Sequence, residues 1–152
     1  MDSNIDHEND LFSSAEKVIP KVAKERFSKL LTPEDYVSTL ESFGKPKPIT
    51  FRANTLRTTE ELVLNEVKKN NLKSTKVHWC PQCNQLVVGT IRELQQLPSF
   101  LANGIYIQSA SSMLSVHALQ VESDMRVLDL CAAPGSKTSQ IAALMENRGM
   151  LV

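Results

Sequence analysis

An apolar run near residue 130 is followed by a loop of small residues that has the chemistry of a ligand site. The run is Val127–Leu130, and residues 131–135 after it read Cys-Ala-Ala-Pro-Gly. If a helix starts after this loop, its first N–H groups are free and carry the positive end of the helix dipole. Such a helix start attracts a carboxylate or a phosphate, and small side chains let the ligand approach the backbone. The stretch therefore predicts a site for an anionic group.

A strand before the loop and a helix after it must hold this site in place. Residues 127–130 are mostly apolar and β-prone without a helical stripe, which predicts a short buried strand. The Pro-Gly pair predicts a sharp turn, and we expect Ser136 to cap the helix that follows. That helix has inward positions at 3.6-residue spacing, and Gly149 is expected just beyond its end: Gln140, Ile141, Leu144 and Met145. Strand, tight loop and helix form the first half of a doubly wound nucleotide-binding unit.

Asp129 is unusual inside the apolar run. A buried carboxylate needs N–H donors or a cation, so we expect it either to brace the loop or to face a positively charged ligand. The loop has neither the Gly-Lys-Ser/Thr spacing of a phosphate loop nor the dinucleotide fingerprint. Neither ATP nor NAD is therefore favoured as the ligand.

Three blocks of the sequence resemble the Nop/Sun family of RNA (cytosine-5) methyltransferases. Leu128–Thr138 reads Leu-Asp-Leu-Cys-Ala-Ala-Pro-Gly-Ser-Lys-Thr and resembles the family's S-adenosylmethionine-binding motif. Ile49–Arg57 resembles its R-x-N-T-L strand, and Gly104–Met113 resembles the segment that leads into its catalytic domain. The blocks occur in the family's order and at about its spacing. The resemblance runs from about Phe27 to the last residue.

The resemblance implies the cofactor S-adenosyl-L-methionine and methyl transfer to cytosine C5 in rRNA or tRNA. It also implies that Lys137 lies at the mouth of the active site, near a catalytic acid and base. A lysine at a helix start opposes the helix dipole, which itself favours a functional role for Lys137. The residues expected to bind the cofactor are Cys131, Ala132, Ala133, Pro134, Gly135, Ser136 and Lys137.

The nucleophile of this chemistry is not predicted among these residues. Cytosine C5 is methylated after a thiolate adds to C6, and the family carries its thiolates in Pro-Cys and Asp-Ala-Pro-Cys motifs. The printed sequence contains neither motif and ends at Val152. Cys131 is expected to be a small packing residue under the cofactor, with catalysis as the alternative. We therefore predict a truncated methyltransferase with weak cofactor binding and no turnover alone, and leave open whether the chain is an enzyme.

Two alternatives to an enzyme stay open. The chain is then a non-catalytic RNA-binding or regulatory fragment, or a subunit completed by a second polypeptide. One strand with its helix and the start of a second strand cannot bury both faces of a sheet. Val127, Leu128, Ile141 and Leu144 would then form an open apolar patch that a partner could cover.

The expected elements, together with what the resemblance implies, divide the chain into three parts. Residues 1–26 form an acidic tail and an N-terminal helix, 27–103 an RNA-recognition-like α+β domain, and 104–152 the incomplete start of a methyltransferase domain. The predicted fold class is thus an α+β RNA-recognition-like domain followed by the truncated start of an α/β Rossmann-like domain. Helices are expected at 15–31, 33–43, 58–72, 94–101 and 111–119. Strands are expected at 49–56, 77–79, 85–88, 105–108 and 127–130. Leu62 and Leu114 are among the side chains expected to point inward.

Basic residues gather in the middle of a chain whose net charge is zero. Between Lys45 and Lys76 there are eight Lys and Arg against three Glu. Such an excess suits an RNA backbone or, equally, a solvated face. Arg52, Asn54 and Arg57 are the RNA-binding candidates, and a contact between domains is the alternative for them.

Cys80 and Cys83 have the spacing of a metal knuckle but lack a second pair of ligands. A structural zinc site normally needs four ligands, so a β-turn with two incidental thiols is predicted, and no metal. Three cysteines without a disulfide pattern indicate a reducing, intracellular compartment, either nucleus or nucleolus or cytoplasm. No apolar run reaches the roughly 18 residues of a membrane span, so a membrane partner is not expected.

Overall fold

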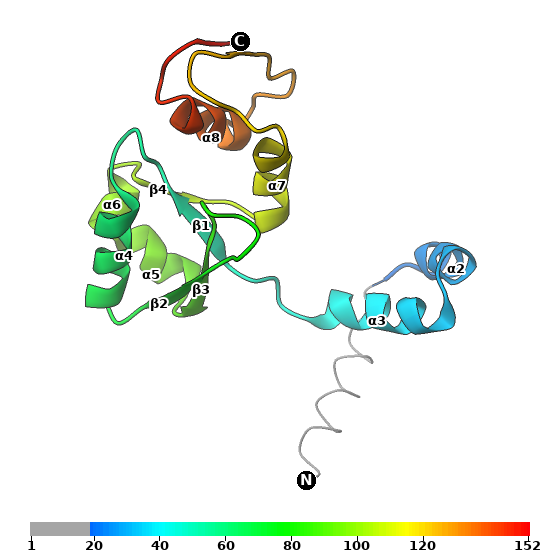
Figure 1. Cartoon of the computed structure of the whole chain (residues 1–152). Coiled ribbons are helices and arrows are strands. Elements are labelled where there is room, and N and C mark those ends of the chain that lie inside the picture. The colour runs from blue at the N-terminus through cyan, green and yellow to red at the C-terminus, as the bar shows by residue number, and fades with distance from the viewer. Residues whose placement is uncertain (1–18) are drawn as a thin grey trace. The chain divides into compact units, whose positions relative to one another are not determined.

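The computed structural model describes residues 19–152 and divides the chain into two compact units, Met1–Lys47 and Pro48–Val152 (Figure 1). The acidic tail and the expected helix start at residues 15–18 lie outside the described residues. The described part of the first unit contains α2 (Lys21–Leu30) and α3 (Pro33–Gly44). Thr32 caps α3 by accepting a hydrogen bond from the Asp35 N–H at 3.2 Å, and Pro33 occupies the first helical position.

A four-stranded antiparallel sheet organises the second unit. Its order is β2-β3-β1-β4, with β1 (Thr50–Ala53) in the interior and β4 (Ile105–Ile107) at one edge. The other edge strand is β2 (Lys73–Lys76), which pairs with β3 (Asn84–Val88). Arg52 lies opposite Tyr106 in the register of β1 and β4.

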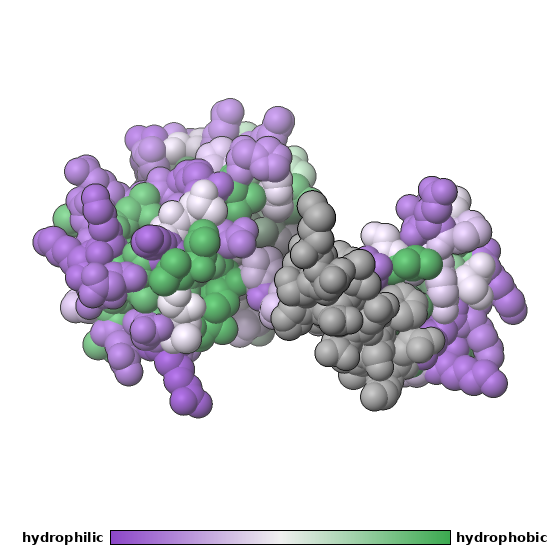
Figure 2. Space-filling model, turned by 90° about the horizontal axis from the view of Figure 1, so that it is seen from below, coloured by the Kyte–Doolittle hydropathy of each residue, from purple (hydrophilic) through white to green (hydrophobic). Residues whose placement is uncertain are grey.

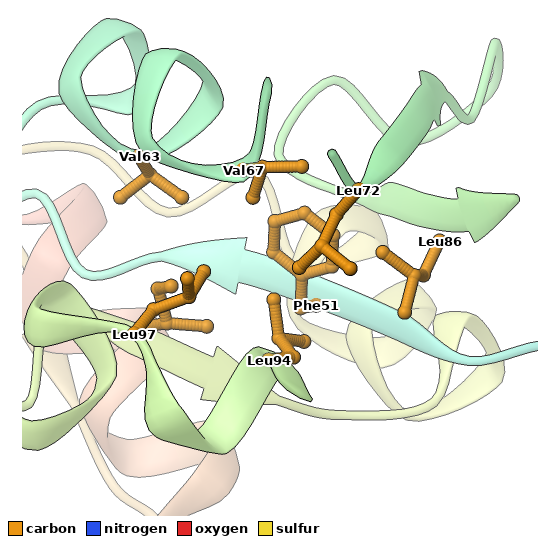
Figure 3. Packing of buried hydrophobic residues seen from close by; sticks show 8 residues of the cluster. Phe51, Val63, Val67, Leu72, Leu86, Leu94 and Leu97 are labelled. Carbon is orange, nitrogen blue, oxygen red and sulfur yellow. The ribbon is translucent and has the colours of Figure 1, made fainter. Parts of the chain in front are cut away.

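Three helices cover one face of this sheet and close its core. They are α4 (Glu60–Lys69), α5 (Ile91–Gln96) and α6 (Pro98–Leu101). Thr59 caps α4, and Thr90 and Glu93 form a reciprocal capping box on α5. Figure 3 shows the Phe51 ring in the middle of the apolar side chains of this core. The buried cluster consists of Phe51, Val63, Val67, Leu72, Leu86, Leu94, Leu97 and Ile105.

The rest of the second unit carries the loop at 131–135. Helix α7 (Ala110–Ala118) follows β4, and α8 (Ser136–Leu144) follows the loop. Between and after them lie two short parallel strands, β5 (Arg126–Val127) and β6 (Met150–Leu151), paired as Arg126 with Met150. A small cluster of Val116, Val121, Ile141 and Met145 holds these elements together.

Several sequence predictions are wrong in detail. The strand expected at 127–130 ends at Val127, and Leu128 and Leu130 are 63% and 85% exposed. The strand expected at 77–79 is instead a turn, closed by hydrogen bonds from the Val77 N–H to Cys83 O and from the Cys80 N–H to Val77 O. Leu62 and Leu114, expected inward, are exposed.

The α+β class is confirmed, and the predicted domain limits stay a prediction. Strand β4, which the predicted division assigns to the methyltransferase part, pairs with β1 in the antiparallel sheet. Figure 2 shows one face of the second unit, on which apolar side chains gather within a surround of hydrophilic ones. No helix among residues 19–152 has the length and apolar character needed to cross a membrane.

Candidate functional site

The turn into α8 is made by a glycine in a conformation that other residues avoid. Gly135 has a φ of 102° and is the N-cap of α8, without a side-chain cap. A Cβ added to Gly135 would meet no heavy atom within 4 Å, so the space over this residue is open. Ser136, expected as the cap, is the first helical residue instead. The Ser136 hydroxyl does not cap the helix. The N–H groups at the start of α8 therefore stay available.

Three backbone N–H groups are unpaired at this helix start. Ser139 is the first residue of α8 whose N–H finds a backbone acceptor, Gly135 O at 2.9 Å. Within the described part of the chain, the N–H groups of Ser136, Lys137 and Thr138 have no acceptor. Free N–H groups together with the positive end of the dipole make this end of α8 attractive to a carboxylate or phosphate.

Asp129 braces the loop, which is one of its two expected roles. Its Oδ1 accepts from the Cys131 N–H at 3.1 Å, and its Oδ2 accepts from the Thr138 hydroxyl at 2.7 Å. The same hydroxyl lies 3.1 Å from Ala132 O. Thr138 therefore bridges the loop from Asp129 to Ala132.

The predicted cofactor-binding residues lie together at the surface. Residues 131–134 are exposed, and Gly135 and Ser136 are half-buried. Cys131 is not packed in the interior as expected, and its thiol is free and exposed. Lys137 is exposed and, with Asp129, lines a hollow of about 170 Å³ whose other walls are Ser115, Val116, Leu119, Val127, Leu128 and Ile141. The segment is thus exposed at the surface, beside a small hollow.

Arg52 lies in the interior rather than on an RNA-binding surface. Its side chain is 1% exposed, and its Nη2 donates to Ser136 O at 3.1 Å and to Ser139 Oγ at 2.8 Å. The expected RNA contact by Arg52 is therefore not available in this structure. Arg52 instead joins β1 to the first turn of α8, and the alternative expectation of a contact between domains stays a prediction.

Asn54 and Arg57 occupy the turn that follows β1. Asn54 is half-buried, with its Nδ2 donating to Asn103 O at 3.0 Å and its Oδ1 accepting from the Leu56 N–H at 3.4 Å. Arg57 is exposed. The structure brings neither residue into the cofactor loop, and of the three RNA candidates only Arg57 presents a free charged surface.

The cysteine pair lies in a turn, and both of its thiols are buried. Cys80 and Cys83 are buried beside Met113, and the Cys83 N–H donates to Cys80 O at 2.8 Å. Burial raises the pKa of the Cys83 thiol to about 11, so this group is protonated at neutral pH. No cluster of three or more His, Cys, Asp or Glu able to hold a metal exists among residues 19–152.

Sequence reasoning missed the polar side chains that hold α8 against the sheet. Gln108, Ser139 and Gln140 all contact Arg52 directly or through one another. The available signal was a glutamine at an inward position of an otherwise apolar helical stripe. A buried polar residue needs a partner, and that partner is another buried polar residue distant in sequence.

A family model described as "16S rRNA methyltransferase RsmB/F" matches residues 116–152. These residues include β5, the loop and α8. The expected relation to the Nop/Sun family is confirmed for this part of the family's length. The matched segment starts within α7, so it contains every residue expected to bind the cofactor.

Curated relatives extend the similarity toward the N-terminus. A 28S rRNA (cytosine-C(5))-methyltransferase from Mus musculus is 34% identical over 118 residues, covering 78% of this chain and 15% of the relative. Ribosomal RNA small subunit methyltransferase F from Cronobacter sakazakii is 35% identical over 141 residues, covering 86% of this chain and 28% of the relative. The chain thus spans less than a third of either relative.

A solved structure supports the same fold. The crystal structure of a methyltransferase homolog protein from Pyrococcus horikoshii is 32% identical, with a TM-score of 0.76. The match covers 93% of this chain and 45% of that one. The arrangement of the sheet, α7, the loop and α8 is therefore shared with a methyltransferase homologue.

Proposed function

We propose that this chain provides the S-adenosylmethionine loop and an RNA-binding surface of an RNA (cytosine-5) methyltransferase that acts on rRNA or tRNA. The exposed loop at 131–137, with its uncapped helix start, carries the proposal. The names of the relatives, which are rRNA methyltransferases, give it the reaction class.

The loop fits the amino-acid end of the cofactor. The free N–H groups of Ser136, Lys137 and Thr138 can receive its carboxylate, and the open space over Gly135 admits it to the backbone. Bound S-adenosylmethionine supplies an electrophilic methyl group. Lys137 adds a positive charge at the mouth of the site, where it can hold an RNA phosphate.

None of the three cysteines is assigned as the nucleophile that adds to cytosine C6. Cys80 and Cys83 are buried, and the high pKa of Cys83 keeps that thiol protonated. Cys131 is exposed, but it lies in the loop assigned to the cofactor. The role of this chain's own residues is thus to hold the cofactor and the RNA.

The sheet and its helices support an RNA-recognition-like domain. Strands and helices follow in the order β1, α4, β2, β3, α5 and α6, β4, which is the β-α-β-β-α-β pattern of split βαβ folds. RNA-recognition domains bind bases on the open face of such a sheet. Here Arg52 on that face bonds to α8, so RNA must bind elsewhere on the domain.

Exposed lysines at the far end of α4 offer that alternative surface. Lys68, Lys69 and Lys73 are exposed, and Lys68 and Lys73 line a groove of about 590 Å³. Its other walls are Leu64, Val67, Asn71, Leu72 and Ser74. Lys76 is less available because its ammonium forms an ion pair with Glu60. Backbone phosphates of RNA suit the three free charges.

The cofactor proposal is tested by NMR titration of the 152-residue chain. S-adenosylhomocysteine should shift the amide signals of Ser136, Lys137 and Thr138. Adenosine, which lacks the amino-acid end, should leave these amides unshifted because it has no carboxylate for them. Equal shifts with both compounds, or no shift at millimolar concentration, would contradict the proposal.

Thiol labelling gives an independent measurement of the same site. Maleimide should label Cys131 well before the buried Cys80 and Cys83. Saturating S-adenosylhomocysteine should slow the labelling of Cys131, whereas adenosine should slow it less. Unchanged labelling of Cys131 in a sample that shows the NMR shifts would place the ligand away from the loop.

The RNA proposal is tested by the salt dependence of binding. Replacing Lys68, Lys69 and Lys73 by Ala should reduce the slope of log K against log salt by about 2, because single-stranded contacts contribute roughly 0.7 each. The matched control removes three exposed charges from α2: Lys21, Arg26 and Lys29. Equal losses in both triple variants would show nonspecific attraction.

RNA binding in a chain whose loop fails the cofactor test would favour a non-catalytic RNA-binding or regulatory fragment. Recovery of cofactor binding on mixing with a second polypeptide would favour a shared sheet.

A further inference from the structure

The Arg52 side chain joins the sheet to the first turn of α8. Its Nη2 donates to Ser136 O and to Ser139 Oγ, at 3.1 and 2.8 Å. The Ser139 hydroxyl in turn donates to Gly135 O at 2.6 Å. The guanidinium therefore reaches, directly or through one hydroxyl, the carbonyl groups of both Gly135 and Ser136. These two residues form the junction between the loop and the helix.

Further polar contacts fix the arginine and the helix. The Arg52 Nε donates to Gln108 Oε1 at 3.1 Å, and Gln108 Nε2 donates to Gln140 Oε1 at 3.2 Å. Gln140 is 1% exposed, and its Nε2 donates to Gln82 Oε1 at 2.9 Å. Strand β1, the end of β4, the turn before β3 and α8 are thus connected by one buried chain of hydrogen bonds.

Burial of the Arg52 guanidinium carries a large free-energy penalty. Its Nη1 is buried without a hydrogen-bond partner, and neither of the salt bridges found among residues 19–152 includes Arg52. Burial lowers its pKa to about 10, and the Tyr106 ring at 4.9 Å offsets only part of the cost of the charge. Removing a charge from water carries a desolvation penalty, and no carboxylate among the described residues pairs with Arg52 to offset it. This cost favours a role other than holding the fold together.

We propose that Arg52 is a positioning residue for the cofactor loop. By holding the Gly135 and Ser136 carbonyls, it aims the free N–H groups of Ser136, Lys137 and Thr138 at the ligand. The nature of that ligand rests on the proposed function. The clamp, by which we mean the bonds from Arg52 that hold the Gly135 and Ser136 carbonyls, rests on the contacts of Arg52. Arginine suits the task because its planar fork donates to three acceptors at once, while lysine has one flexible ammonium.

The clamp is tested by amide hydrogen exchange on the unliganded chain. Arg52→Lys keeps the charge and loses the fork, and Ser139→Ala removes only the hydroxyl that connects Arg52 to Gly135. Both should speed exchange at residues 139–144, the hydrogen-bonded amides of α8, about tenfold more than at β1 and β3. Val63→Ala, in the core under α4, is the control that should speed exchange across the whole sheet. Exchange at 139–144 that is unchanged, or raised no more than in the sheet, would overturn the proposal.

Cofactor affinity supplies a readout that a purely structural role would not change. At a temperature where both variants stay folded, Arg52→Lys and Ser139→Ala should bind S-adenosylhomocysteine several-fold more weakly than the unmodified chain does, while Val63→Ala binds normally. Normal affinity in both clamp variants would overturn the positioning role. If the unmodified chain shows no binding, the proposed cofactor fails, and the exchange result still decides whether Arg52 holds the loop.

Discussion

The sheet core and the loop region bury their apolar residues to different extents. Around Phe51, eight apolar residues are buried, and α4, α5 and α6 close the cluster from one side. Around α7, α8, β5 and β6, four are buried, while Leu128, Leu130 and Val152 are more than half exposed. Stability is therefore concentrated in the sheet core, and the loop region combines a small core with an open surface.

The two regions also use polar groups differently. Beside the sheet core, Thr59 and Thr90 cap the helices α4 and α5. In the loop region, Asp129 and Thr138 hold the loop from one side, and Arg52 holds it from the other. A loop with few apolar contacts needs such bonds to keep one shape, because fixing a backbone residue costs about 1–2 kcal/mol of conformational entropy.

The largest expected effect is on the sheet core. Phe51→Ala should lower the free energy of unfolding by about 3–5 kcal/mol, because it leaves a cavity at a fully buried position. Urea denaturation measures the loss. The control Leu101→Ala, at an exposed position on α6, should change stability by less than about 0.5 kcal/mol. A small loss for Phe51→Ala would mean that the sheet core is not the main source of stability.

Gly135→Ala should have a smaller effect that is confined to the loop. The space around Gly135 is open, so the cost of about 1–2 kcal/mol comes from the left-handed backbone alone. Gly104→Ala is the matched change in the sheet region, where a Cβ would lie 2.9 Å from Ser99 O. Denaturation should show a loss for both variants, whereas the NMR titration should show weaker S-adenosylhomocysteine binding for Gly135→Ala only. Weaker S-adenosylhomocysteine binding in both variants would show that the effect of Gly135→Ala is not specific to the loop region.

Thr138→Val should loosen the loop without affecting the sheet. It removes the hydroxyl that donates to Asp129, a bond worth about 0.5–1.5 kcal/mol. Hydrogen exchange should rise at Cys131, whose N–H donates to Asp129, and at Ser139, whose N–H donates to Gly135 O, and stay constant in β1. Thr75→Val, on the exposed face of edge strand β2, serves as control and should be close to neutral. Faster exchange throughout the sheet in Thr138→Val would show that the two regions unfold together.

The smallest effect on stability is expected for Leu130→Asp. This side chain is 85% exposed, so its loss should change the free energy of unfolding by less than about 0.5 kcal/mol. The variant should self-associate less at high concentration, as sedimentation velocity would show, because it interrupts an exposed apolar surface. A loss of several kcal/mol would mean that Leu130 is packed in solution.

The sequence by itself predicted several local features and the similarity to RNA methyltransferases. Pro-Gly after an apolar run predicted the turn, Thr32 and Thr59 predicted helix starts, and the motif at 128–138 predicted the relation that the comparisons confirm. These features depend on residues close together in the chain, whose conformational preferences act whatever the rest of the fold does. The glycine at 135 is an example, since its left-handed φ is local.

Only the tertiary structure decided what the isolated polar residues do. Arg52 reads as an RNA contact in the sequence, because arginine in a basic stretch is usually exposed. Its burial depends on Ser136 and Ser139, which lie more than 80 residues away in the chain. Likewise, Leu130 reads as part of a buried strand, and its exposure depends on which elements pack beside β5. The burial of Arg52 and the exposure of Leu130 are set by contacts between distant segments, which residue type and local spacing did not predict.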